Sequence, residues 1–251
     1  MSGHSKWSTI KHKKGKADAL RGRLFTKLIR EITVAAREGG GDVNINPRLR
    51  LAVQAGKDSN MPADNIDRAV KKGTGELPGV VYEAATYEGY GPAGVAFLIE
   101  VLTDNKNRTV SEVRHTFAKF GGSMAETGAV AWQFDSKGTL TVAKDDATED
   151  DLMLAGLDAG LEDIDAEGEA LEAICAPTDL ESLKQALEEA EIPFADVQLT
   201  RVPQNTVAIA GGEAATLIRL LESLEENDDV QTVHANFDID ISELEAIAAE
   251  E

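Results

Sequence analysis

The cations of the first thirty positions are the residues best suited to chemistry. Only one acidic residue, Asp18, stands among them. Clustered cations neutralise phosphates and release counterions, and an aromatic ring among them can stack on a base. The pattern predicts a nucleic-acid-binding segment, with a solubilising basic tail as the alternative. The candidate residues are Lys6, Trp7, Lys11, His12, Lys13, Lys14, Lys16, Arg21, Arg23, Lys27 and Arg30.

A second basic group follows in residues 60–73. Its cations, Arg68, Lys71 and Lys72, are three and four positions apart, which places them on one face of a helix. This face is suited to phosphate, but the same cations would also stabilise the helix by opposing the negative end of its dipole. Spacing alone favours neither interpretation. The motif also supplies four candidate surface residues, which are Asn60, Met61, Pro62 and Asn65.

Two further motifs lie where strands are expected to end. The first covers residues 87–94, and the second covers residues 103–108. The second would place free backbone N–H groups at the start of a helix, where anions bind. Turn and capping roles explain the same residues more simply, and the glycines match no phosphate-loop spacing. The candidate residues are Tyr87, Glu88, Gly89, Tyr90, Asn105, Asn107 and Arg108.

The sequence gives little support to an enzyme. Its four histidines are scattered, and no His/Cys spacing is typical of a metal site. Cys175 lies in an expected strand without a neighbouring histidine, and no nucleophile or nucleotide-binding motif is present. We therefore expect no catalytic residue, metal, cofactor or small-molecule substrate.

Charge is divided sharply along the chain. Residues 1–75 contain 16 Lys and Arg against 7 Asp and Glu, whereas the remaining residues contain 9 against 38. We call the basic residues 1–75 the head and the acidic residues 76–251 the body. This division suggests that the head binds nucleic acid, because the body repels phosphate. The single cysteine suits a reducing compartment, and neither a secretory signal nor a membrane-length apolar run is apparent. The basic start, poor in acidic residues, leaves a transit peptide as the alternative. We expect a cytoplasmic protein with no membrane partner.

Periodicity predicts an α+β fold, with a three-helix N-terminal domain followed by two ferredoxin-like α+β domains, one inserted in the other. Residues 1–16 read as a flexible basic arm and 17–79 as the helical domain, whose last helix we expect to end at Gly73. Residues 80–135 and 205–240 form a discontinuous domain that includes strands at 130–134 and 206–210, and a helix capped by Thr109 with Glu112. Residues 136–204 have the order β-α-β-β-α-β of an inserted ferredoxin-like domain. Residues 241–251 read as an acidic tail.

The same residues carry a family resemblance. The opening Gly3-His-Ser-Lys-Trp7, the stretch from Asn60 to Gly73, Tyr87-Glu-Gly-Tyr-Gly-Pro92 and Leu102-Thr-Asp-Asn-Lys-Asn-Arg-Thr109 resemble the YebC/PmpR family. The likeness extends over essentially the whole chain and is most specific in residues 1–135. It implies three domains, the third inserted in the second, and neither enzymatic activity nor a cofactor.

The resemblance implies two different functions. Bacterial members of the family are described as probable DNA-binding transcriptional regulators, which would make DNA the partner. Mitochondrial relatives are translational activators of cytochrome c oxidase, and bacterial members are also placed on the ribosome, where they assist synthesis of proline-rich stretches. The second function would make ribosomal RNA and the ribosome the partners. A three-helix bundle suits DNA, whereas a basic arm with a lone tryptophan suits irregular RNA.

Overall fold

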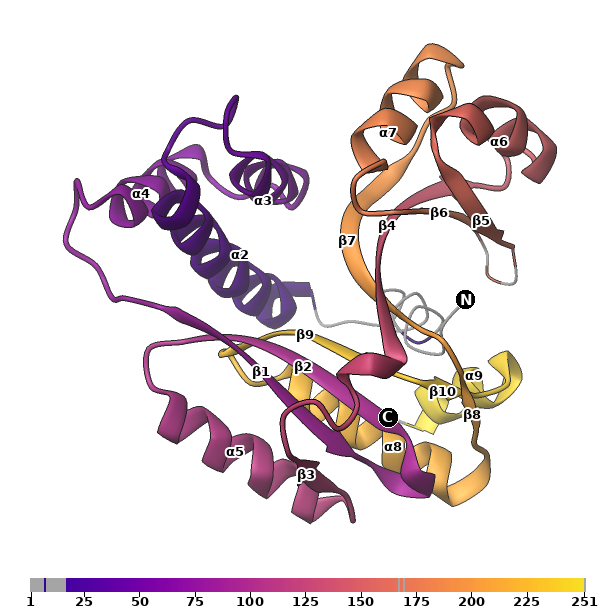
Figure 1. The fold of residues 1–251 in the computed structure, drawn as a ribbon. Coiled ribbons are helices and arrows are strands. Elements are labelled where there is room, and N and C mark those ends of the chain that lie inside the picture. Colours follow the sequence, from indigo (N-terminus) through magenta and orange to yellow (C-terminus); the bar gives the residue numbers. More distant parts are fainter. Residues whose placement is uncertain (1–6, 8–16, 167, 169, 251) are drawn as a thin grey trace.

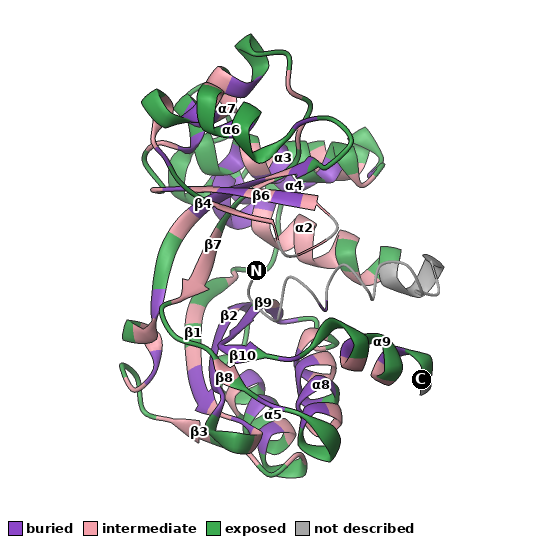
Figure 2. Cartoon of the chain, turned by 90° about the vertical axis from the view of Figure 1, so that its right-hand side faces the viewer, coloured by how far each residue is buried: buried purple, intermediate pink, exposed green. Residues whose placement is uncertain are grey.

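The computed structural model describes residue 7 and residues 17–166, 168 and 170–250. Three bodies are visible in Figure 1: a helical one, a central sheet covered by helices, and a second sheet that projects from the central one. Each has its own hydrophobic core, and buried residues gather where helices meet each other or a sheet (Figure 2). The domain boundaries stay a prediction, which this division into cores supports.

Within residues 17–79, which the structure describes, three helices form the helical body, as the sequence predicted. They are α2 (Ala17–Gly39), α3 (Pro47–Asp58) and α4 (Ala63–Thr74). Helix α3 begins at Pro47 because Asn46 caps it: the Asn46 side chain accepts a hydrogen bond from the Leu49 N–H. Ile32 of α2, Leu49 of α3 and Ala69 of α4 meet in the core between the helices.

Gly73 does not end α4, as the sequence had predicted, but lies inside it. The helix ends at Thr74, and Gly75 follows in the left-handed conformation with φ of 84°. Gly73 is buried where α4 crosses α2, and a Cβ on it would lie 2.4 Å from the Thr33 carbonyl oxygen. The glycine therefore permits close helix packing, and Gly75 supplies the stop.

The central sheet has the strand order β3-β1-β2-β9, with every neighbouring pair antiparallel. Its strands are β1 (Glu83–Tyr90), β2 (Ala96–Thr103), β3 (Ser123–Ala125) and β9 (Val230–Ala235). Helices α5 (Lys106–Lys119) and α8 (Gly211–Glu225) cover one face, while the helical body and the second sheet lie on the other side (Figure 1).

Two strands expected in this sheet are absent from it. Residues 131–133 form a short 3-10 turn, η2 (Ala131–Gln133), and β3 takes the place of the expected strand at 130–134. At 206–210 the chain forms β8 (Val207–Ala208), which pairs in parallel with β10 (Phe237–Asp238) outside the main sheet. β1 occupies the position expected for β8, because the turn at residues 91–95 pairs it directly with β2. The ferredoxin-like layout is kept with two strands exchanged: β3 for the one expected at 130–134 and β1 for the one expected at 206–210.

The second sheet confirms the predicted ferredoxin-like order. It contains β4 (Phe134–Ala143), β5 (Leu161–Asp165), β6 (Ala170–Cys175) and β7 (Ala195–Pro203), arranged β5-β6-β4-β7 and fully antiparallel. Helices α6 (Glu149–Gly156), with the 3-10 turn η3 (Leu157–Ala159) after it, and α7 (Leu180–Glu189) pack on it. The long strands β4 and β7 lead out of the central body and back (Figure 1).

Two distant segments complete the central core. Residues 241–250, expected to be a tail, form α9 (Ile241–Glu250), which buries Leu244 and Ala248. Trp7 joins the same hydrophobic cluster with 2% of its surface exposed. The many acidic residues of α9 made it resemble a tail in the sequence, although its apolar residues form a stripe along one side of a helix. No described helix is both long and apolar enough to cross a membrane.

Replacing Gly73 with alanine should destabilise the helical body. The new methyl group would collide with the α2 backbone, so we expect a loss of roughly 2 kcal/mol even though alanine favours a helix. Urea unfolding followed by circular dichroism measures the effect. Gly22→Ala is the matched control, because nothing lies within 4 Å of the new Cβ on α2; it should gain about 0.5–1 kcal/mol. Equal midpoints for the two variants would contradict the packing argument.

Candidate nucleic-acid interface

Six of the eleven residues in the predicted basic cluster lie outside the described residues. These positions are Lys6, Lys11, His12, Lys13, Lys14 and Lys16. Trp7 is described, and it is buried in the central core rather than presented to solvent. The expectation that its ring stacks on a base is therefore wrong for this structure, because no face of the indole is open. Nothing in the local sequence indicated this, since Trp7 is surrounded by polar residues.

The cations of α2 bind the acidic loop that follows α8. Arg23 pairs with Glu226 at 2.8 Å, and the Lys27 ammonium donates to the Glu225 carbonyl oxygen at 2.9 Å. The last carbonyl groups of a helix carry partial negative charge, so the Lys27 ammonium is stabilised at the end of α8. The ion pair of Arg23 with Glu226 is favourable for the same electrostatic reason. Arg21 is exposed. The predicted phosphate-binding face of α2 is thus largely an intramolecular interface.

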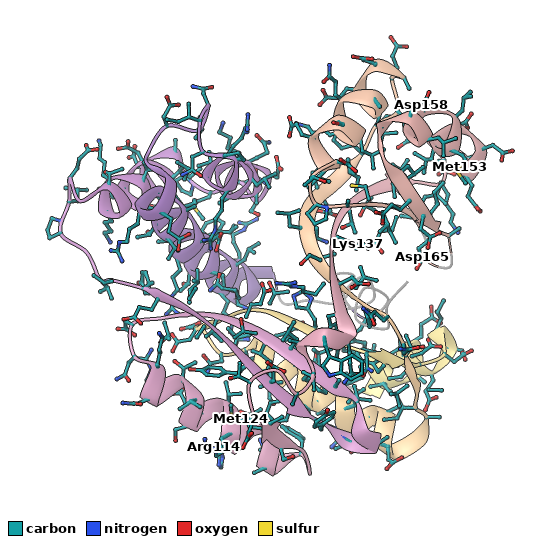
Figure 3. All side chains as sticks on the ribbon, in the orientation of Figure 1. Arg114, Met124, Lys137, Met153, Asp158 and Asp165 are labelled. Atoms are coloured by element: carbon teal, nitrogen blue, oxygen red, sulfur yellow. The ribbon has the colours of Figure 1, made fainter. Side chains whose placement is uncertain are left out.

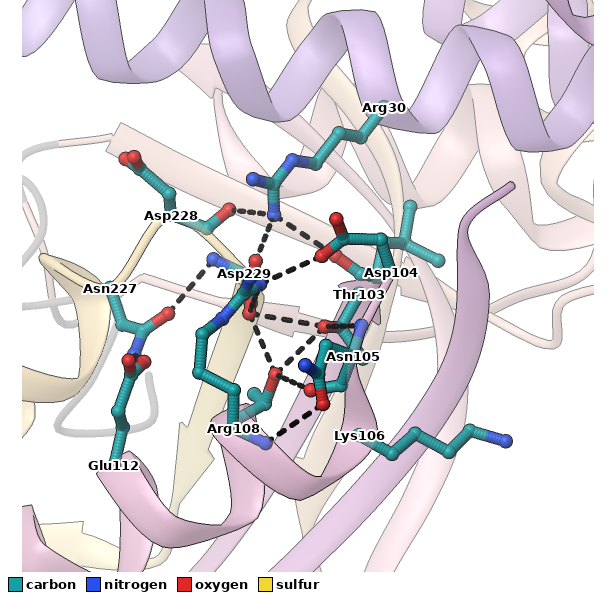
Figure 4. A network of polar contacts seen from close by, with 12 residues as sticks. Arg30, Thr103, Asp104, Asn105, Lys106, Arg108, Glu112, Asn227, Asp228 and Asp229 are labelled. Atoms are coloured by element: carbon teal, nitrogen blue, oxygen red, sulfur yellow. Dashed lines mark hydrogen bonds and ion pairs between the residues drawn. The ribbon is translucent and has the colours of Figure 1, made fainter. Parts of the chain in front are cut away.

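Arg30 enters a network centred on Asp229 (Figure 4). Its guanidinium donates to an Asp229 carboxylate oxygen at 2.5 Å and to the carbonyl oxygens of Leu102 and Asp228 at 3.1 and 2.7 Å. Arg108 binds the other Asp229 oxygen at 2.6 Å. The carboxylate side chain is only 3% exposed, so it is almost enclosed by its partners. Arg30 was predicted to bind nucleic acid and Arg108 to be a candidate surface residue, and here both neutralise an internal carboxylate.

Two threonines complete the shell of Asp229. The Thr109 hydroxyl lies 2.6 Å from it and the Thr103 hydroxyl 3.1 Å. Burial alone would raise the pKa of Asp229, but hydrogen bonds from Arg108, Thr109 and Arg30 outweigh burial and lower it to about 2. Thr109 is therefore not the predicted helix cap. That role belongs to Asn105, whose side chain accepts from the Arg108 N–H at 3.1 Å.

The motif around Asn60 is a tight connection between two helices. Asn60 has a left-handed φ of 58°, and the Met61 N–H reaches back to the Gly56 carbonyl oxygen at 2.9 Å. This is the hydrogen-bond pattern that closes a helix C-terminus, and Met61 is buried behind it. Asn60 and Pro62 are exposed, whereas Asn65 is half-buried. The motif positions α4 against α3, so its geometric role is sufficient to explain it.

The motif from Tyr87 to Tyr90 also works inside the molecule. Glu88 is 3% exposed and accepts from the backbone N–H groups of Gly128, Val130 and Ala131 at 2.6, 2.6 and 3.0 Å. Burial would raise its pKa, but these N–H groups prevail and lower it. Gly89 lies against Phe117, where a Cβ would approach within 2.6 Å. Glu88 and Gly89 are thus not surface residues, as had been expected.

The two tyrosines of this motif are half-buried. The Tyr87 hydroxyl donates to the Lys106 carbonyl oxygen at 3.3 Å, and the Tyr90 hydroxyl donates to that of Ala129 at 3.2 Å. Asn107 is exposed on the first turn of α5. The motif therefore fixes the loop that leads from β3 into the inserted sheet.

Among the described residues of the head, exposed cations outside α2 gather on α3 and α4. Arg68 and Lys72 are exposed on α4, while Lys71 pairs with Asp67 at 2.7 Å. A second row, which was not predicted from the sequence, is exposed along one side of α3 and consists of Arg50, Gln54 and Lys57. The sequence signal for this row was its spacing of four and three residues, which repeats beside the equally spaced buried residues Leu49, Val53 and Gly56.

Within the described residues, no group of three or more His, Cys, Asp or Glu side chains is arranged to hold a metal ion. Cys175 is buried, and burial raises the pKa of its thiol to about 11. Such a thiol is protonated at neutral pH and is a poor nucleophile. Its neighbours are core residues of the second sheet.

Asp229→Asn should destabilise the chain by about 3 kcal/mol, because it leaves two guanidinium groups without their buried anion. Unfolding can be followed by the fluorescence of Trp7 in a Trp132→Phe background, since Trp7 is the buried one of the two tryptophans. Asp104→Asn is the matched control, because Asp104 contacts the same Arg108 from an exposed position. It should cost below about 0.5 kcal/mol. A similar loss of unfolding free energy in both variants would show that Asp229 contributes no more to stability than the exposed Asp104.

Acid should remove the same stabilisation. An unfolded aspartate has a pKa near ~3.9, so the Asp229 contribution is complete above about pH 5 and is lost as pH falls toward about 2. The difference in unfolding free energy between the parent and Asp229→Asn should therefore shrink by about 2 kcal/mol between pH 6 and pH 2. Urea titrations at several pH values test this. A difference that does not change with pH would show that Asp229 is not ionised in the fold.

Comparisons with known proteins agree with this architecture. Residues 5–76 match the model of the TACO1/YebC protein N-terminal domain, and residues 82–237 match that of the TACO1/YebC second and third domain. A crystal structure of a conserved hypothetical protein from Aquifex aeolicus superposes with a TM-score of 0.83 at 46% identity, covering 92% of this chain and 96% of that one.

Relatives are similar over nearly their whole length. A probable transcriptional regulatory protein of Desulforapulum autotrophicum is 55% identical over 95% of this chain and 97% of its own. One of Geobacter sulfurreducens is 55% identical over 98% of this chain and 100% of its own. The resemblance noted in the sequence is confirmed, and the chain belongs to the TACO1/YebC family.

Proposed function

We propose that this chain is a cytoplasmic, non-enzymatic regulator of gene expression that binds DNA through the open basic faces of α3 and α4. The observation that carries the proposal is the exposed row Arg50, Gln54 and Lys57 on α3. The names of the relatives, probable transcriptional regulatory proteins, agree with it. The exposed Arg21 and the lysines before residue 17 would add contacts to phosphate.

The row on α3 has the chemistry of base reading. Arginine and lysine pair with guanine edges in the major groove, and glutamine pairs with adenine. Seven residues of helix rise about 10 Å, close to three base-pair steps of ~3.4 Å. Gln54 donates to Asp58 at 2.8 Å, an exposed bond that it can exchange for a base. Beside the row, Leu49 and Val53 anchor the helix in the core.

A second candidate is a translation factor that binds ribosomal RNA. One observation favours it: Trp132, in the turn η2, is 66% exposed, and its indole N–H is held by the Ala129 carbonyl oxygen at 3.0 Å. A fixed, open aromatic face is suited to an unpaired base, which irregular RNA offers and duplex DNA does not. Trp132 thus replaces Trp7 as the residue available for stacking.

Arg50→Ala with Lys57→Ala should weaken binding to duplex DNA and lower the log–log salt slope by about 0.9 for each phosphate that the variant no longer neutralises. Gln54→Ala should cost about 1–3 kcal/mol on a preferred sequence only. Fluorescence anisotropy with labelled duplexes at several salt concentrations gives both values. Arg114→Ala with Arg219→Ala is the charge-matched control, because both arginines are exposed on the helices of the central sheet.

The same variants separate the two candidates. If Trp132→Ala abolishes binding to a folded ribosomal RNA fragment while the α3 variants bind as the parent does, the translation factor is supported instead. If the α3 pair and the control pair bind DNA equally, the α3 face is not the contact.

A further inference from the structure

The inserted domain exposes apolar side chains along one side of α6 and η3. Met153, Leu154 and Leu157 are 49%, 89% and 63% exposed, although Leu152 and Gly156 beside them are buried in the core. Leu154 is the most exposed large hydrophobic residue in the described part of the chain. A fold gains nothing from leaving such a group in water, so clustered exposed apolar residues commonly mark an interaction site.

A hollow opens beside these side chains. It lies between the start of α6 and the turn after α7 and encloses about 430 Å³. Leu154, Ala155 and Ile192 supply apolar surface, while three carboxylates stand on its wall. The full set of lining residues is Asp146, Ala147, Asp151, Leu154, Ala155, Ala190, Glu191 and Ile192.

The negative charge around the hollow indicates which kind of partner can bind there. Residues 136–204 contain 18 Asp and Glu against 4 Lys and Arg, a net charge of −14. Asp146, Asp151 and Glu191 bring this charge to the edge of the apolar surface. Nucleic acid would be repelled here, and an acidic protein equally so. A positively charged partner with an apolar anchor complements both features.

Helix α6, which supplies part of the lining of the hollow, lies on the outer side of the inserted domain. Figure 3 shows Met153 and Asp158 at the outer side of the inserted domain, and in Figure 1 helix α6 lies on the side away from α3 and α4. Figure 2, viewed from that side, shows α6 and α7 toward the viewer. A partner seated on α6 would therefore leave the basic faces of α3 and α4 accessible.

We propose that this hollow binds a basic amphipathic helix of a partner protein. An apolar side chain of that helix packs against Leu154 and Ile192, and lysines or arginines on either side of it pair with Asp146, Asp151 and Glu191. The surface is small, so the contact is transient, with a dissociation constant in the micromolar range. The inference goes beyond nucleic-acid binding and does not depend on it.

The test uses the full chain and a synthetic probe. The probe is a labelled 14-residue helical peptide with leucines at positions i, i+4 and i+7 and lysines at the exposed positions. A second peptide carries serine in place of leucine at the same charge. Fluorescence anisotropy at ~0.15 M salt measures both, because at this ionic strength purely long-range attraction is largely screened. The leucine peptide should bind at least about tenfold more tightly, from burial of one leucine.

Variants locate the contact. Leu154→Ser should weaken binding of the leucine peptide about tenfold. Leu199→Ser is the matched control: Leu199 is 57% exposed on β7 of the same domain, and its replacement should leave binding unchanged. Asp146→Asn with Glu191→Gln should weaken binding severalfold and reduce its salt dependence.

Three outcomes would overturn the proposal. Equal binding of the two peptides would show that charge alone attracts the peptide. Equal losses of affinity from Leu154→Ser and Leu199→Ser would show that the peptide does not bind in the hollow. A dimer that sedimentation detects in the parent and not in Leu154→Ser would identify a second copy as the occupant. DNA binding measured on Leu154→Ser should match the parent, so failure here is distinct from failure of the proposed function.

Discussion

A buried carboxylate determines how the chain is put together. Asp229 joins α2, the start of α5 and the strand that follows α8, which are far apart in sequence. An ionised carboxylate that loses water must be paired and hydrogen-bonded, or the cost of burial is not recovered. Arg30, Arg108 and two threonines meet this demand from separate elements. Any displacement of α2 would leave the charge partly unpaired, and so the helical body is held against the edge of the central sheet.

This constraint changes the meaning of the basic head. A positive segment and a negative body within one chain attract each other before either meets a partner. The inner side of α2 is bound in this way, and Arg30 also lies 5.2 Å from the centre of the Tyr82 ring. The outer rows on α3 and α4 are not occupied by this contact. The cations on the inner side of α2 thus hold the helical body against the central sheet. The cations on α3 and α4 are available to bind a polyanion.

Local signals predicted local structure well. The asparagine cap and first-turn proline of α3 and the β-α-β-β-α-β order of the inserted domain were readable from sequence and are present. Features that depend on distant partners were not readable. Arg30 and Asp229 are 199 positions apart, and nothing near Arg30 indicates that its anion is internal. Gly73 resembled a helix stop because the Thr33 carbonyl oxygen that it must admit belongs to another helix. Likewise, β1 and not β8 pairs with β2, and the sequence of one strand does not show which other strand it pairs with.

The central core is assembled from pieces made at very different times. Trp7 belongs to it, as do Leu244 and Ala248 of α9, while the inserted domain is one continuous run between β4 and β7. During synthesis the inserted domain has all of its strands before its host has acquired β9. The core that contains Trp7 also needs β9 and α9, which follow the inserted domain in the sequence. The inserted domain can therefore form all of its strand pairs from one uninterrupted stretch of chain, whereas its host has to recruit segments from both sides of its guest.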